Sequence, residues 1–133
     1  MKYPIGIQHF ESLRQDGYVY VDKTRIIHDI VSNGRYYFLS RPRRFGKSLL
    51  ISTLKAYYEG KRELFQGLAM EQLEQEWRVH PVLHLDLNIE KYASQESLDN
   101  ILESNLVQWE NLYGAEPSER SFSLRLAGII RRA

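Results

Sequence analysis

The chain has 133 residues, of which 43% are hydrophobic and 26% are charged, a balance typical of one globular domain and not of a disordered chain. The net charge of +1 excludes bulk attraction to nucleic acid or to a membrane, and the absence of cysteine excludes disulfides and thiolate metal sites. Because the N-terminus lacks a signal-peptide core and no run approaches the ~18 apolar residues of a membrane span, we expect a cytoplasmic protein.

The first part of the chain predicts a helix, a strand and a loop. Asp22 is a candidate N-cap for a helix over residues 23–32, whose isoleucines and valine share one face, and Gly34 comes after the helix as a stop signal. Residues 36–39 are aromatic and apolar, which predicts a short buried strand. Residues 40–46 contain a proline and predict a loop.

The remaining predicted elements are mostly helical. The apolar spacing predicts a helix over residues 47–58, and then one or two short helices within residues 62–77. A second strand is predicted over residues 82–87, directly after a proline. The clearest helical stripe covers residues 95–113, and a last helix is expected after Ser118, burying Phe122, Leu126, Ile129 and Ile130.

The order of these elements predicts the fold class. Helices alternate with strands, which favours an α/β fold of the P-loop NTPase type, with a parallel sheet flanked by helices. Two strands alone make a poor sheet. We therefore expect that the chain is the N-terminal portion of a larger domain.

The sequence RPRRFGKS, residues 41–48, has the features of a phosphate-binding loop. It joins a predicted strand to a predicted helix, where backbone N–H groups can bind phosphate oxygens. In such a loop a lysine reaches the β- and γ-phosphates and a hydroxyl ligates magnesium, so Lys47 is the candidate catalytic residue and Ser48 the candidate magnesium ligand. The predicted nucleotide-binding residues are Arg43, Arg44, Phe45, Gly46, Lys47, Ser48 and Leu49.

The loop departs from the strict motif at its start. The first glycine of G-x-x-x-x-G-K-[ST] would fall at position 41, which is Arg41 here, and Pro42 fixes the next φ angle. Two alternatives stay open on the residues alone. The cluster of Arg41, Arg43, Arg44 and Lys47 could contact nucleic-acid phosphates, or the chain could be a non-catalytic interaction fragment.

Four blocks resemble the predicted AAA-ATPase-like family of bacterial proteins. The blocks are YVDKT at residues 20–24, RPRRFGKSLL at residues 41–50, YYEGKRELFQGL at residues 57–68 and HPVLHLDLN at residues 80–88. The resemblance implies a P-loop ATPase fold and ATP binding through Lys47 and Ser48, with Mg²⁺. It also makes the missing first glycine an expected variant of the loop.

The resemblance also implies elements that lie beyond residue 133. Family members are usually longer and carry a Walker B strand ending in Asp-Glu, and many carry a restriction-endonuclease-like nuclease domain that could contact nucleic acid. We therefore expect residues 1–133 to be a P-loop domain that ends before Walker B, and the resemblance supports nucleotide binding while leaving ATP hydrolysis by these residues alone open. Asp86 is either an internal Walker B acid or a polar residue that closes a strand, and Tyr20 or Val21 either lines the adenine or belongs to the core.

Overall fold

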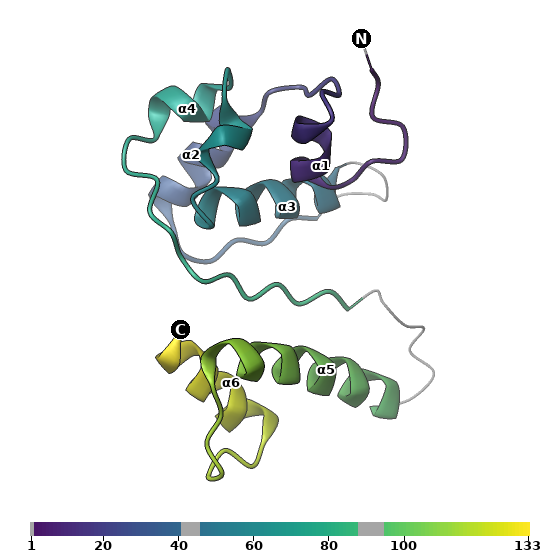
Figure 1. Ribbon diagram of the computed structural model, residues 1–133, viewed down its shortest axis with the longest axis vertical. Helices are drawn as coiled ribbons and strands as arrows, with labels where there is room; N and C mark the ends of the chain where they lie inside the picture. Colours follow the sequence, from purple (N-terminus) through teal and green to yellow (C-terminus); the bar gives the residue numbers. More distant parts are fainter. Residues whose placement is uncertain (1, 41–45, 88–94) are drawn as a thin grey trace. The chain divides into compact units, whose positions relative to one another are not determined.

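A computed structural model of the chain describes residues 2–40, 46–87 and 95–133. The chain divides into two compact units, Met1–Val82 and Leu83–Ala133 (Figure 1). In the described part of the chain, no helix is both long and apolar enough to cross a membrane. The helices of the first unit are α1 (Phe10–Gln15), α2 (Thr24–Asn33), α3 (Lys47–Tyr58), the 3₁₀ helix η1 (Arg62–Phe65) and α4 (Ala69–Leu73), and those of the second unit are α5 (Gln95–Tyr113) and α6 (Phe122–Arg132).

The predicted α/β fold with a parallel sheet is wrong. Residues 36–39 and 82–87 belong to no strand, and within residues 2–40, 46–87 and 95–133 the β pairing is limited to one isolated bridge between Lys2 and Tyr18. The first predicted strand is not buried either, since Tyr36 is 94% and Phe38 92% exposed. An apolar run indicates that its side chains favour a strand. A strand also needs a neighbouring strand whose backbone pairs with its N–H and C=O groups.

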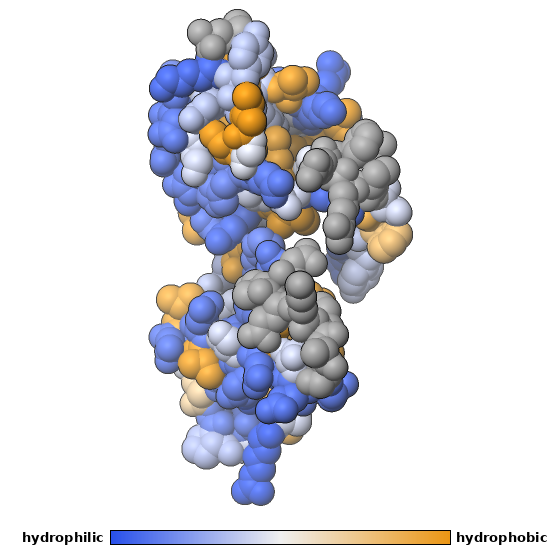
Figure 2. Space-filling view, turned by 90° about the vertical axis from the view of Figure 1, so that its right-hand side faces the viewer, coloured by the Kyte–Doolittle hydropathy of each residue, from blue (hydrophilic) through white to orange (hydrophobic). Residues whose placement is uncertain are grey.

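Apolar side chains at the surface are a general feature of the chain. They occur in both units, and Figure 2 shows them as separate patches among hydrophilic side chains. Because many apolar side chains are exposed, each helix contributes few buried residues to the core. In α5 only Ile101 and Leu106 of the predicted stripe are buried, and Leu112 is 74% exposed.

The helix predictions in the first unit are largely confirmed. α3 has the predicted bounds, and Gly34 comes directly after the last residue of α2. Asp22 is not the N-cap of α2, because the helix begins one residue later than predicted and Lys23 takes that position, although the Asp22 carboxylate accepts the N–H of Thr24 at 2.9 Å. Two short helices, η1 and α4, lie within residues 62–77 as predicted, and Gly67, at φ +79°, lies between them. The six-residue α1 was not predicted, because so short a helix shows less than two turns of periodicity.

The core of the first unit lies where these helices meet. α1 packs against α3, and α2 packs against α4. The ring of Phe10 in α1 lies 4.9 Å from the ring of Phe65 in η1 and 5.3 Å from the ring of Tyr20. The buried residues of this cluster are Phe10, Ile27, Ala56, Leu64, Phe65, Leu68 and Met70.

Asp22 and Thr24 of the YVDKT block join α2 to α4. One oxygen of the Asp22 carboxylate accepts the hydroxyl of Thr24 at 2.6 Å, and the other accepts the N–H of Ala69 at 2.8 Å. The fully buried Thr24 hydroxyl in turn accepts the N–H of Met70 at 3.0 Å. Burial alone would raise the pKa of Asp22, but these hydrogen bonds outweigh it and the pKa lies below its ordinary value. This block therefore fastens two helix starts together.

The YYEGKRELFQGL block is fastened to α1 by two cations. Arg14 donates to the carbonyl of Leu64 at 2.8 Å and to that of Gln66 at 2.6 Å. Lys61 pairs with Glu11 at 2.9 Å. The block thus has a structural part in this unit, because its backbone is held against the helix that supports α3.

The second unit is a pair of helices joined by a turn. Arg125 of α6 pairs with Glu103 and Glu110 of α5. Arg132 donates to both oxygens of Glu119 at 3.0 Å, above Gly128, where an added Cβ would lie 1.6 Å from the Glu119 carboxylate. Of the side chains predicted to be buried in the last helix, Ile129 is buried, whereas Phe122, Leu126 and Ile130 are exposed.

Candidate functional site

The candidate site begins at Gly46, the residue that precedes α3. Its backbone lies in the left-handed region, at φ +80° and ψ +19°. Among the described residues, beyond the chain neighbours of Gly46, no atom lies within 4 Å of the position that a Cβ would take, and the positive φ angle itself favours glycine here. The first helical backbone bond is made by Gly46 itself, whose carbonyl accepts the N–H of Leu50 at 2.9 Å.

The next three predicted site residues form the first turn of α3. Lys47 and Ser48 are exposed, and Leu49 is half-buried and packs against the core of the first unit. No side chain of the described residues caps this helix. The N–H groups of a first helical turn have no partner within the helix. The exposed start of α3 therefore presents backbone donors together with an ammonium and a hydroxyl group.

The arginine part of the loop is not described. Arg41, Arg43, Arg44 and Phe45 lie outside the residues that the structure describes. Gly46, Lys47, Ser48 and Leu49 follow one another at the start of α3, and phosphate binding by them and by the arginines stays a prediction.

α3 is fixed against α1 one turn after the candidate site. The hydroxyl of Ser52 accepts the N–H of Phe10 at 2.9 Å and donates to the carbonyl of Leu49 at 2.9 Å. The buried hydroxyl of Thr53 donates to the same carbonyl at 2.7 Å. Ser52 and Ser48 are four residues apart and so share a face of the helix. These bonds give the start of α3 a rigid support.

The arrangement at this helix start suits an anion. A helix N-terminus carries partial positive charge, and Lys47 adds a full charge to it. Ser48 offers one oxygen to a cation, and Mg²⁺ characteristically takes one or two protein ligands and completes its shell with water and phosphate oxygens. In the described part of the chain, no group of three or more acids or histidines could hold a metal ion by itself.

Three other candidate residues lie apart in sequence from the start of α3. Tyr20 packs edge-on against the ring of Phe10 at the core, and Val21 is 71% exposed. Burial raises the pKa of the Tyr20 hydroxyl, as expected of a core aromatic residue. Asp86 lies in a segment of the second unit without helix or strand, whereas Lys47 and Ser48 belong to the first.

Comparison with known proteins gives a family and a relative. The family model described as "Predicted AAA-ATPase" matches residues 4–133. The chain is also 38% identical over 136 residues to an uncharacterized protein in the vnfD 5' region of Azotobacter chroococcum mcd 1. That similarity covers 99% of this chain and 26% of the relative, so the chain spans about a quarter of the relative's length. No solved structure matches the chain.

Proposed function

We propose, because this chain belongs to the predicted AAA-ATPase family, that it binds ATP with Mg²⁺ at the start of α3. The observation that carries the proposal is the left-handed Gly46 leading directly into an exposed helix start with Lys47 and Ser48 as its first residues. In the proposed complex, the first-turn amides and Lys47 bind the β- and γ-phosphates. The hydroxyl of Ser48 ligates the Mg²⁺ that the phosphates carry.

The proposal extends to the residues that precede Gly46. Arg43, Arg44 and Phe45 would contribute backbone N–H groups to the phosphates, and the two guanidinium groups would help to neutralise a triphosphate. Leu49 contributes its amide and anchors the helix start in the core. None of these groups activates a water molecule, so the proposal is for binding and does not include hydrolysis.

Isothermal titration with ATP and Mg²⁺ tests this function. Wild type is expected to bind, and Lys47→Ala to lose roughly 10- to 100-fold in affinity, since hydrogen bonds to charged groups contribute about 1.5–3 kcal/mol. Lys55→Ala is the matched control, because Lys55 lies on the same helix and forms only a 3.7 Å pair with Glu59. Folded wild type that does not bind ATP would overturn the proposal.

Nucleic-acid binding is the competing function of the same cations. It predicts that short duplex DNA binds without nucleotide, with an affinity that falls steeply as salt rises. Titrating ATP–Mg²⁺ and the duplex into the same preparation, each at two salt concentrations, separates the two functions. The nuclease-like domain implied by the resemblance stays a prediction that no residue of this chain tests.

A further inference from the structure

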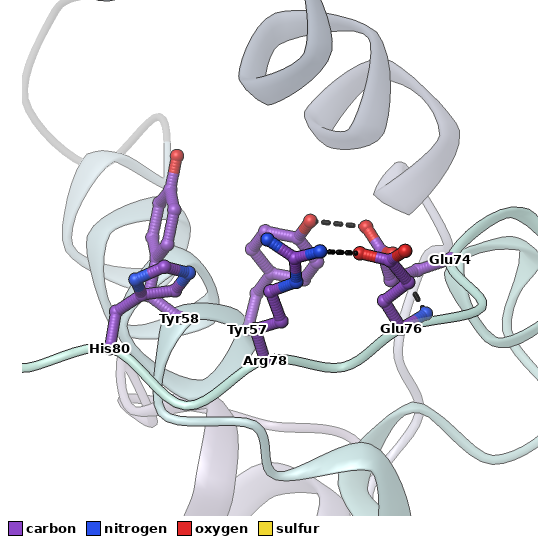
Figure 3. Close-up of a pocket in the computed structure, with 6 residues that line it drawn as sticks. All are labelled: Tyr57, Tyr58, Glu74, Glu76, Arg78 and His80. Atoms are coloured by element: carbon purple, nitrogen blue, oxygen red, sulfur yellow. Dashed lines mark hydrogen bonds and ion pairs between the residues drawn. The ribbon is translucent and has the colours of Figure 1, made fainter.

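A polar hollow lies at the end of α3, away from the candidate phosphate site at its start. It has a volume of about 160 Å³ and lies wholly within the first unit (Figure 3). Its walls come from the last turn of α3 and from the segment after α4. We call it the α3-end pocket, and its lining residues are Tyr57, Tyr58, Glu74, Glu76, Arg78 and His80.

Aromatic rings form one side of the α3-end pocket. The Tyr58 ring lies 5.1 Å from the Tyr57 ring and 5.9 Å from the His80 ring, at interplanar angles of 68° and 78°. The N–H of His80 donates to the carbonyl of Tyr58 at 2.7 Å, which fixes the segment to the end of the helix. The faces of the two tyrosine rings carry partial negative charge and attract cations.

Trp77 anchors the rest of the segment. Its backbone has φ +40°, a strained value for a bulky residue, and its indole packs on the rings of Phe65 at 5.1 Å and Tyr57 at 5.8 Å. With Trp77 turned towards the core, the neighbouring Glu76 and Arg78 side chains line the pocket instead.

Carboxylates give the pocket a negative charge. Figure 3 shows the Tyr57 hydroxyl directed at Glu74, to which it donates, and the N–H of Glu76 donates to the same carboxylate at 3.2 Å. The hydrogen bond from Tyr57 holds the pKa of Glu74 below its ordinary value, although burial opposes it, and nearby His28 lowers it further. Glu74 is therefore ionised at neutral pH, and the C-terminus of α3 adds partial negative charge.

The guanidinium of Arg78 is a cation that already lines this pocket. Its guanidinium lies 2.8 Å from the Glu76 carboxylate, and both side chains are mostly exposed, at 72% and 65%. An ion pair this exposed is weak and can be displaced by a competing cation.

We propose that the α3-end pocket binds an organic cation of the guanidinium or alkylammonium type, with Arg78 as a built-in competitor. The cation lies between the aromatic rings and Glu76, in the place that the Arg78 guanidinium leaves. An anion fits poorly because the two carboxylates repel it. A metal ion fits poorly because, in the described part of the chain, no three or more acidic or histidine side chains are grouped so that they could hold one. The proposal is independent of nucleotide binding.

Titration with butylguanidinium, followed by the amide and ring NMR signals of the protein, tests this proposal. N-butylurea is the matched ligand, because it has the same shape without the charge. Butylguanidinium is expected to shift the signals of Tyr58 and His80 and to bind better than N-butylurea. Equal binding of the two compounds, or shifts confined to other residues, would overturn the proposal.

Two variants with opposite expected effects on butylguanidinium affinity separate the proposal from misfolding, because misfolding could only weaken binding. Arg78→Ala is expected to strengthen butylguanidinium binding roughly two- to fivefold by removing the competitor, and Glu76→Gln to weaken it by a similar factor. Arg62→Ala and Glu63→Gln, at exposed positions of η1, are the controls and should change nothing. Unchanged or weaker binding by folded Arg78→Ala contradicts the proposal.

The source of the cation is distinguished by a further probe. The peptide acetyl-Gly-Arg-Gly-amide carries the same guanidinium on a backbone. Tighter binding of this peptide than of butylguanidinium assigns the pocket to an arginine of a partner chain, and weaker binding assigns it to a free small cation.

Discussion

The two ends of α3 differ in the charge of the ligand that each suits. The start of the helix presents Lys47, Ser48 and first-turn N–H groups, all of which suit phosphate. The end of the same helix is surrounded by tyrosines, histidine and carboxylates, which suit a cation. The polarity of one helix dipole is thus reinforced at both ends by side chains of matching charge, and one rigid element carries two separate candidate sites.

The largest expected change in affinity tests whether the two ends of α3 bind their ligands independently. Lys47→Ala should lower the affinity for ATP–Mg²⁺ roughly 10- to 100-fold, because a charged phosphate contact is lost, while leaving butylguanidinium binding unchanged. Titration calorimetry and NMR titration of the same preparation measure the two affinities. A parallel loss of both would show that the helix itself had been disturbed, and the comparison would fail.

A smaller effect is expected at the residue that precedes the helix. Gly46→Ala should destabilise the fold by about 1–2 kcal/mol, since an alanine is strained at φ +80°, and should weaken ATP binding as well. Gly46→Asn should cost less, because asparagine tolerates the left-handed region. Urea unfolding of both variants gives the difference, and an equal cost for the two would contradict the role assigned to the backbone conformation.

At the end of α3, Glu74 should make the stability of the fold depend on pH. The pKa of Glu74 is lowered from 4.5 in the folded chain, so its ionised form contributes stability above about pH 4.5, and this contribution is lost as pH falls through the lowered value. Glu74→Gln should therefore lower the melting temperature at pH 7, where the lost charge-assisted bond contributes about 1 kcal/mol, and the difference should shrink towards acid pH. Glu63→Gln, which is exposed, should show no such trend.

The Tyr57 hydroxyl gives a finer check of the same interaction. Burial and the adjacent Glu74 raise the pKa of Tyr57, so this hydroxyl remains a donor throughout the neutral range. Tyr57→Phe removes the donor, and the pKa of Glu74 should then rise towards 4.5. An NMR titration of the Glu74 side chain measures this shift, and an unchanged pKa would remove the reason given for its ionisation.

The sequence predicted the two ends of α3 unequally, for a physical reason. The start of the helix is encoded by adjacent residues, so RPRRFGKS indicated it and the apolar spacing gave the bounds of α3 as the structure has them. The α3-end pocket joins Tyr57 and Tyr58 to residues 74–80, and only the fold brings these segments together. No local pattern could indicate that pocket.

The same distinction explains the wrong fold class. Local spacing was enough for α2, α3 and α5, because a helix makes its own hydrogen bonds within one segment. Residues 36–39 and 82–87 had the composition of strands, but they find no neighbouring strand in the described chain. Pairing depends on a second segment, and the pattern of the first does not contain it.

One measurement tests the separate action of the two ends directly. An assigned amide spectrum of the chain is titrated first with ATP–Mg²⁺ and then, in the same sample, with butylguanidinium. We expect the nucleotide to shift Gly46, Lys47, Ser48 and Leu49, and the guanidinium to shift Tyr57, Tyr58 and His80, without overlap. A nucleotide that leaves Gly46 to Leu49 unshifted, or two ligands that shift the same residues, would contradict the account.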